Sequence, residues 1–240
     1  MKEHKVIDLF CGCGGLSLGL EQAGFKVAFA SDIDSNCAST YQKNFNIKPD
    51  QMYVGDIRDL NKNNDLLKSD FKGIDLVCGG TPCQGFSMAN RQRIIDDPRN
   101  FLYKEYLLFL SKIQPNFFII ENVRGMLNKI NEIIEDINNV LGTKYNVAFH
   151  LFNVKDYGVP QNRERLIIIG NKIGINSQTI IDSIIKKATT IPQYTLFDAI
   201  GDLPELKPNR LKNSSKIEND SIGYFCKEYK YKNTKFRCFI

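Results

Sequence analysis

Short apolar runs alternate with amphipathic segments along the first 170 residues of the chain. Seven of the apolar runs predict strands, at Val6–Phe10, Val27–Ser31, Met52–Val54, Ile74–Cys78, Phe117–Glu121, Val147–Phe152 and Leu166–Ile169. Several of these runs are apolar throughout, which is typical of strands that are covered on both faces of a sheet. Helices are predicted between them, near residues 15–23, 35–45, 99–113 and 126–141. The repeated strand-then-helix order predicts an α/β fold with a doubly wound, mostly parallel sheet of seven strands.

The regular alternation weakens after about residue 171. Residues 209–216 are polar, and residues 223–240 mix aromatic and basic side chains without a clear period. We therefore expect a first domain over residues 1–190, followed over residues 191–240 by the opening of a second region that the chain does not complete.

The net charge of +5 is carried by the end of the chain. Residues 205–240 hold nine Lys or Arg and four Asp or Glu, whereas acidic and basic residues balance over residues 1–204. A basic segment is compatible with a polyanionic partner, but most such segments are simply solvated. Charge alone therefore favours a solvated segment.

Composition excludes several classes of protein. Hydrophobic residues make up 42% of the chain and charged residues 25%, as in ordinary globular proteins. No apolar run reaches the roughly 20 residues of a membrane-spanning helix, and the N-terminus has no signal-peptide pattern. We therefore expect a cytoplasmic protein with no membrane partner.

The seven cysteines predict neither a disulfide framework nor a metal site. Their number is odd, and the chain is long for a disulfide-stabilised fold. A single glycine separates Cys11 from Cys13, and the two histidines, His4 and His150, are far apart in sequence. This spacing does not match that of a zinc site.

A glycine-rich loop follows the first predicted strand. Residues 11–15 read Cys-Gly-Cys-Gly-Gly, and such a loop lets a ligand approach the N-terminus of the helix that follows. Asp32 lies 20 residues after Gly12, at the end of the second strand, a position that suits a carboxylate binding ribose hydroxyls. Ser17 stands where the third glycine of the dinucleotide fingerprint would be, so an adenosine-bearing cofactor is favoured over a dinucleotide. The alternative is a tight turn without a ligand.

The same stretch also matches a serine-hydrolase motif. Residues 15–19 read Gly-Leu-Ser-Leu-Gly, which would make Ser17 a nucleophile and His150 its base. The nucleophilic serine of that motif belongs on the turn between strand and helix. Here the preceding glycines already make the turn, so Ser17 is expected inside the helix and the esterase alternative is not favoured.

A second candidate loop follows the fourth predicted strand. It contains Cys83 directly after Pro82, with glycines on either side. Ligands of open α/β sheets bind at the carboxyl ends of the strands, where a nucleophilic thiol would be useful. The alternative for a single cysteine is a small buried hydrophobic residue. The stiff, glycine-flanked setting favours the reactive role for Cys83.

Charged residues follow the later strands. Glu121 ends the fifth predicted strand, where desolvation would raise its proton affinity, so that it could donate to a ring nitrogen. Arg163 and Arg165 precede the seventh strand and would point to one side if the strand has begun. This arginine pair could lower a thiol pKa or orient a base. Ion pairs at strand ends, with Glu164 as the partner of the arginines, are the alternative.

Four motifs, in this order and spacing, resemble those of the DNA (cytosine-5)-methyltransferase family. They occupy Asp8–Gly15, Thr81–Ser87, Glu121–Val123 and Gln161–Arg165, and the similarity runs from about residue 5 to residue 204. One departure is Thr81, where the family usually has a second proline. The resemblance implies a Rossmann-like methyltransferase fold.

The resemblance implies S-adenosylmethionine as the cofactor, S-adenosylhomocysteine as its product, and no metal ion. Asp32 would bind the ribose hydroxyls, Ile33 would pack on the adenine, and Asp56 with Ile57 would contact the adenine edge. The complete set implied for the cofactor pocket is Phe10, Gly12, Gly14, Leu16, Asp32, Ile33, Asp56, Ile57 and Pro82.

The resemblance also implies the reaction and its partners. Cys83 would be the nucleophile, Glu121 the acid that contacts the cytosine, and Arg163 and Arg165 active-site arginines, while residues 85–100 would form a mobile loop over the target base. The substrate would be cytosine in double-stranded DNA, flipped out of the helix, and the setting bacterial restriction-modification.

The family usually continues with a target-recognition domain and two further motifs that nothing after Pro204 matches. Three explanations stay open: a truncated gene product, a fragment, or one chain of a two-chain enzyme, a division found in the family. We therefore expect a second polypeptide as a candidate partner, and weak cofactor binding and poor methylation by the chain alone. Methylation of transfer RNA, and nucleic-acid binding without turnover, are the alternative functions.

Overall fold

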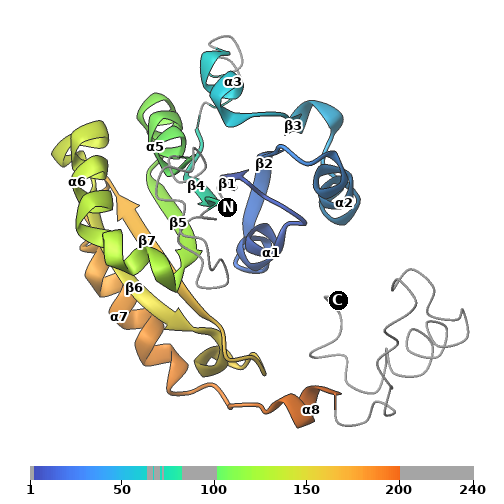
Figure 1. The fold of residues 1–240 in the computed structure, drawn as a ribbon, viewed down its shortest axis with the longest axis vertical. Coiled ribbons are helices and arrows are strands. Elements are labelled where there is room, and N and C mark those ends of the chain that lie inside the picture. Colours follow the sequence, from blue (N-terminus) through green and yellow to red (C-terminus); the bar gives the residue numbers. More distant parts are fainter. Residues whose placement is uncertain (1–2, 64–66, 68–70, 72, 83–101, 201–240) are drawn as a thin grey trace, which may run out of the picture. The chain divides into compact units, whose positions relative to one another are not determined.

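The computed structural model describes residues 3–63, 67, 71, 73–82 and 102–200 (Figure 1). The chain divides into two compact units. The first comprises residues 1–152 and 164–185, and the second comprises residues 153–163 and 186–240. The second unit therefore contains a loop that the sequence analysis had assigned to the first domain.

A single seven-stranded sheet organises the fold. Its strands are β1 (His4–Leu9), β2 (Phe25–Asp32), β3 (Met52–Val54), β4 (Leu76–Gly80), β5 (Phe117–Val123), β6 (Asn146–Asn153) and β7 (Glu164–Asn171), in the order β3-β2-β1-β4-β5-β7-β6. The pairs from β3 to β5 are parallel, and β7 runs antiparallel to β5. This confirms the predicted α/β fold with a mostly parallel sheet. The strand order reverses between β1 and β4, which is where ligands of such sheets bind.

Helices connect the strands. They are α1 (Gly15–Gln22), α2 (Ser35–Phe45), α3 (Ile57–Lys62), α5 (Leu102–Ile113), α6 (Ile130–Leu141), α7 (Ser177–Ala188) and α8 (Leu196–Ile200). Figure 1 shows α1 and α2 beside β2, and α6 and α7 beside β6 and β7. Among the described residues, no helix is both long enough and apolar enough to cross a membrane.

Alternate residues of the strands bury opposite faces of the sheet, as the period of two requires. Ile7 of β1 packs with residues of α3, α5 and α6 in one apolar cluster. Its neighbour Val6 packs in a second cluster with residues of α1 and α2. A third cluster joins α7 to β6 and β7. The central strands are thus covered on both faces, which explains their continuous apolar sequences.

The predicted elements differ from the structure mainly at their ends and after residue 171. All seven predicted strands are present, and α2 has the predicted bounds. The predicted helix 126–141 begins as a 3-10 helix over Arg124–Lys129 before α6 starts at Ile130. Of the predicted helix 99–113, residues 102–113 lie in the described part. The helices α3, α7 and α8 were not predicted.

Candidate cofactor and catalytic site

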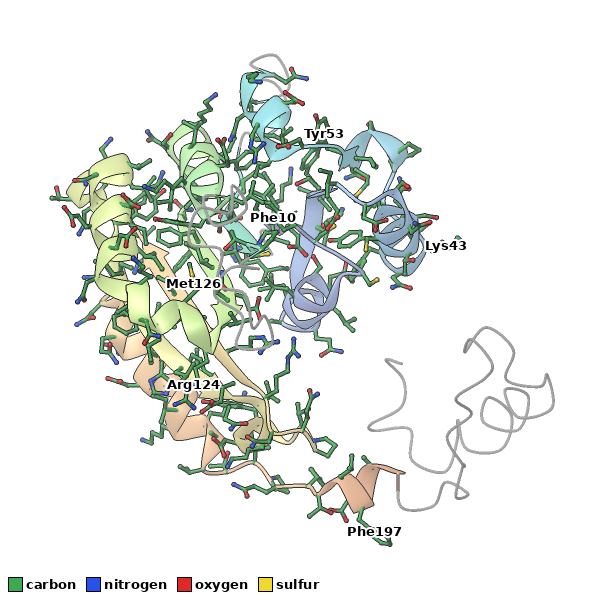
Figure 2. The ribbon with its side chains drawn as sticks, in the orientation of Figure 1. Phe10, Lys43, Tyr53, Arg124, Met126 and Phe197 are labelled. Carbon is green, nitrogen blue, oxygen red and sulfur yellow. The ribbon has the colours of Figure 1, made fainter. Side chains whose placement is uncertain are left out.

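The glycine loop between β1 and α1 is a chain of unusual backbone conformations. Phe10, Gly12 and Gly14 have φ angles of 56°, 52° and 94°. A positive φ is uncommon for an aromatic residue, and such strained conformations concentrate at functional sites. The loop is closed by a bond from the Gly14 amide to the Cys11 carbonyl, at 2.9 Å. Figure 2 shows Phe10 beside the central strands.

Asp32 lies at the end of β2, as predicted, and holds this loop. Its Oδ2 accepts a hydrogen bond from the Gly12 amide at 2.8 Å, and its Oδ1 accepts one from the Asp34 amide at 2.9 Å. Each carboxylate oxygen can accept a second bond, so Asp32 retains the capacity to bind ribose hydroxyls. The sequence did not indicate its contact with Gly12.

Apolar side chains are exposed at the ends of β2 and β3, where the resemblance led us to expect the adenine. Ile33, directly after β2, is 71% exposed, and Val54, at the end of β3, is 50% exposed. Asp56 caps α3 by accepting a hydrogen bond from the Arg58 amide at 2.8 Å. The Ile57 side chain is buried in the core, so any ligand contact of Ile57 would come from its backbone. Val54 is an addition to the residues chosen from the sequence.

The space beside each glycine of the loop indicates whether a ligand could bind close to the backbone. A Cβ added at Gly12 or Gly15 would meet no atom of the described residues within 4 Å, so both face space that these residues leave open. A Cβ at Gly14 would instead lie 2.1 Å from the Phe45 ring, so packing explains that glycine. Leu16, in the first turn of α1, and Pro82, which follows β4, are half-buried. The open space and the exposed apolar residues fit an adenosine-bearing cofactor.

Glu121 and Arg165 form an ion pair on adjacent strands. Arg165 Nε lies 2.8 Å from Glu121 Oε1, and the two side chains are 20% and 31% exposed. Arg165 also donates to the Glu164 carbonyl at 2.7 Å. The expected desolvation of Glu121 is thus wrong, because its side chain is partly exposed and faces a cation. Glu164 pairs with Arg124, at 2.6 Å, and not with Arg163 or Arg165 through its carboxylate.

Asn122 ties the end of β5 to the segment after β4. Its Nδ2 donates to the Thr81 carbonyl at 3.0 Å and lies 2.9 Å from the Thr81 hydroxyl. Its Oδ1 accepts from the Val123 amide at 2.8 Å. A proline at position 81, which the family usually has, would lack this hydroxyl. Thr81 and Pro82 are the last described residues before Cys83.

Several predicted site residues are placed differently or not described. Cys83 and the predicted loop 85–100 lie outside the described residues. Strand β7 begins at Glu164, so Arg163 precedes it and belongs to the second unit. The strand has therefore not begun at Arg163, and the condition under which the two arginines would point to one side is not met. Within the described ranges, no group of three or more His, Cys, Asp or Glu side chains is arranged to hold a metal ion.

Ser17 lies inside α1, as expected, and is fully buried. Its hydroxyl donates to Asp8 Oδ2 at 2.6 Å. A nucleophile must reach its substrate, and this hydroxyl has no exposed surface. The esterase alternative is therefore not supported.

The model of the C-5 cytosine-specific DNA methylase family matches residues 4–235. Among the relatives, the Type II methyltransferase M.MthTI of Methanothermobacter thermautotrophicus is 34% identical over 95% of this chain and 68% of its own length. M.FnuDI of Fusobacterium nucleatum is 42% identical over 72% of this chain and 48% of its own length. M.AquIA of Picosynechococcus is 36% identical over 86% of this chain and 91% of its own length.

The chain thus spans about half to two thirds of two of these relatives and nearly all of the third. Among solved structures, an E. coli prophage-encoded DNA modification methyltransferase has a TM-score of 0.68 and is 34% identical, over 85% of this chain and 56% of that one. Spodoptera frugiperda DNMT2 has a TM-score of 0.57 at 21% identity, over 72% of this chain and 51% of that one, and shares the fold.

Proposed function

Since the chain belongs to the C-5 cytosine-specific DNA methylase family, we propose that it transfers a methyl group from S-adenosylmethionine to carbon 5 of cytosine in double-stranded DNA. The observation that carries the proposal is the match of this family model over residues 4–235. The Type II methyltransferases among its relatives support a role in restriction-modification. Methylation of cellular DNA would be a cytoplasmic activity.

The proposed cofactor site uses the residues around the glycine loop. When bound, S-adenosylmethionine supplies an electrophilic methyl group. Phe10, Gly12, Gly14 and Leu16 would form the floor of its site, with Gly15 as an addition, because a Cβ there would enter open space. Asp32 would accept hydrogen bonds from ribose hydroxyls. Ile33, Val54, Asp56, Ile57 and Pro82 would surround the adenosine.

Cys83 would provide covalent catalysis. Carbon 5 of cytosine is a poor nucleophile, and addition of the Cys83 thiolate to carbon 6 would give it enamine character. Carbon 5 would then attack the methyl group, the bond between sulfur and the methyl group would break, and S-adenosylhomocysteine would leave. Loss of the carbon 5 proton would allow the bond between sulfur and carbon 6 to break, which restores the ring. The target cytosine would be flipped out of the helix, because a base inside the duplex is out of reach.

Glu121 would stabilise the charge that builds up on the ring. Its carboxyl, either protonated or sharing a proton with ring nitrogen 3, would face the cytosine. Arg165 would hold Glu121 in place through the 2.8 Å ion pair and would keep its orientation fixed between strands β5 and β7. We propose Arg163 as a further active-site cation, carried by the segment that precedes β7.

We propose that residues 1–190 form the catalytic domain and that residues 191–240 begin the target-recognition region. We further propose that a second polypeptide supplies the rest of this region. M.AquIA, matched over 91% of its length, supports this division because a curated relative of similar length exists. Full activity would then require both chains.

The test is methyl transfer from labelled S-adenosylmethionine to genomic DNA, followed by nucleoside analysis. The proposal expects 5-methylcytosine in DNA, produced by the chain with its candidate partner and weakly or not at all by the chain alone. Transfer RNA serves as the competing substrate. Label in transfer RNA but not in DNA would reject the proposed substrate, and label in neither, with the partner present, would reject the activity.

A further inference from the structure

A buried hydrogen-bonded chain lies beneath the glycine loop and links three residues from different elements. The Ser17 hydroxyl of α1 donates to Asp8 Oδ2 of β1 at 2.6 Å, and lies 2.5 Å from the Tyr41 hydroxyl of α2. Because the proton of Ser17 is used on Asp8, the Tyr41 hydroxyl is the donor of the second bond. The three residues are at most 1% exposed, so water does not compete for these bonds.

The same face of α2 also touches the glycine loop directly. A Cβ at Gly14 would lie 2.1 Å from the Phe45 ring and 3.0 Å from the Tyr41 ring, so both rings pack on the loop backbone. The two rings stack with centroids 4.4 Å apart. Asn44 Nδ2 donates to the Cys13 carbonyl at 3.3 Å. The α2 helix thus supports two successive residues of the loop.

We propose that Tyr41 and Ser17 are positioning residues for the methyl-donor loop: the chain from Tyr41 through Ser17 to Asp8 holds residues 11–14 in the conformation that binds the cofactor. This inference rests on the proposed function, because it assumes that the loop binds S-adenosylmethionine. Neither side chain has exposed surface, so both act through the backbone above them and not by touching the ligand.

Ionisation of Asp8 should make the effect of this hydrogen-bonded chain on cofactor binding depend on pH. Burial raises the pKa of Asp8 from 3.8 to about 7, and the charge of Asp32 raises it further, while hydrogen bonds from Ser17 and Cys78 oppose the shift. The groups that face it are Ser17 on α1, Tyr41 on α2, Asp32 on β2, Cys78 on β4, Cys11 in the loop and Tyr106 on α5. Ionised Asp8 is the better acceptor for Ser17 and favours a cationic ligand. Affinity for S-adenosylmethionine should therefore rise between pH 6 and pH 8.

The test compares Tyr41→Phe with Tyr145→Phe in the full chain. Tyr145 is a matched control, since it is also buried and its hydroxyl donates to a backbone carbonyl, that of Pro115, at 2.6 Å. Two quantities are measured: amide hydrogen exchange at residues 12–18 without any ligand, and the Kd for S-adenosylmethionine at pH 6, 7 and 8. Ser17→Ala also removes the hydrogen bond between Tyr41 and Ser17 and serves as the test variant if Tyr41→Phe folds poorly.

We expect Tyr41→Phe and Ser17→Ala to exchange faster at the Gly14 and Leu18 amides and to bind S-adenosylmethionine roughly 3- to 10-fold more weakly, as loss of one buried hydrogen bond allows. Tyr145→Phe should lose stability without either effect. Asp8→Asn should bind with an affinity that no longer changes with pH. Unchanged exchange and Kd in both loop variants would overturn the inference alone. No measurable binding by the unaltered chain in the presence of the candidate partner chain would overturn the proposed function and the inference with it.

Discussion

At the scale of single residues, the ionisation of Asp8 carries a consequence for stability. Burial raises its pKa from 3.8 to about 7 in the folded protein. The folded state therefore holds this proton more tightly than the unfolded chain. The contribution of protonated Asp8 to the free energy of unfolding is fully present below about pH 4 and is lost as the pH rises through 7. The loss corresponds to on the order of 4 kcal/mol.

Asp8→Asn removes this titration and leaves an uncharged side chain of similar shape. We expect the variant to be less sensitive to pH between 4 and 8, and more stable than the unaltered protein at pH 8. Urea unfolding at several pH values measures the difference. Equal pH dependence in both proteins would contradict the assignment of this titration to Asp8.

Gly15 offers a separate test of the proposed cofactor site. It begins α1, its φ is not positive, and a Cβ there would meet no protein atom within 4 Å. Gly15→Ala should therefore preserve or raise stability, by up to about 1 kcal/mol from helix propensity. It should weaken S-adenosylmethionine binding, because the methyl group would occupy the ligand's space.

Gly19→Ala is the matched control for Gly15, because it lies in the same helix and also faces open space. It should change stability in the same direction and leave cofactor binding unaltered. Thermal unfolding and ligand titration on both variants give the comparison. If the two variants bound the cofactor equally well, Gly15 would not line the site.

Much of the local structure around the proposed cofactor site could be predicted from residue types and spacing. The glycine loop, Asp32 and the position of Ser17 inside the helix followed from the sequence. The contacts of Tyr41 with Ser17 and Gly14 could not, because they join residues 24 and 27 positions apart through side-chain packing. The ion pair of Glu121 with Arg165 was missed for the same reason, since it depends on the antiparallel register of β5 and β7.

At the scale of elements, Asn122 joins the end of β5 to the segment that leads to Cys83. It is buried and makes bonds to Thr81 and Val123. Asn122→Ala would remove the bonds to the buried Thr81 and to the half-buried Val123 amide, at a cost of about 1–3 kcal/mol. It should also slow the proposed covalent addition by Cys83 roughly 10- to 100-fold, because Thr81, two residues before Cys83, would lose its bonds to Asn122.

Asn61→Ala is the matched control for Asn122, since Asn61 is equally buried and bonds to Glu105, between α3 and α5. It should lose similar stability and keep its rate of covalent addition. Chemical unfolding and the rate of adduct formation on duplex DNA separate the two effects. Equal rates in the two variants would show that Asn122 has a purely structural role.

Helix α7 was not predicted, although its sequence has the spacing of apolar residues that is typical of a helix. Ile180, Ile181, Ile184 and Ile185 follow a helical spacing, and they pack in the cluster that joins α7 to β6 and β7. The Asn176 side chain accepts from the Gln178 amide at 2.9 Å, as a helix cap does. The helices α3 and α8 are six and five residues long, too short for periodicity to identify them.

At the scale of the whole molecule, the parallel sheet gathers distant motifs at one edge. The carboxyl ends of β1, β2 and β4 carry the glycine loop, Asp32 and the Thr81 segment, and β4 pairs with β5 in a register that sets Gly80 beside Glu121. A Cβ at Gly80 would lie 3.0 Å from Glu121 Oε2, so the glycine admits the carboxylate. The order of β1 and β4 at the switch point thus brings the proposed cofactor-binding and catalytic motifs to the same edge of the sheet.

The most direct test of the account uses duplex DNA in which 5-fluorocytosine replaces cytosine. Fluorine at carbon 5 cannot leave as a proton does, so the bond between Cys83 and carbon 6 should persist after methyl transfer. With S-adenosylmethionine and the candidate partner chain, we predict an adduct that survives denaturation and is absent from Cys83→Ser. The adduct should be retained by Cys37→Ser, in which a half-buried cysteine of α2, outside the glycine loop, is replaced. If the unaltered chain formed no adduct under these conditions, or if Cys83→Ser formed one, Cys83 would not be the covalent nucleophile.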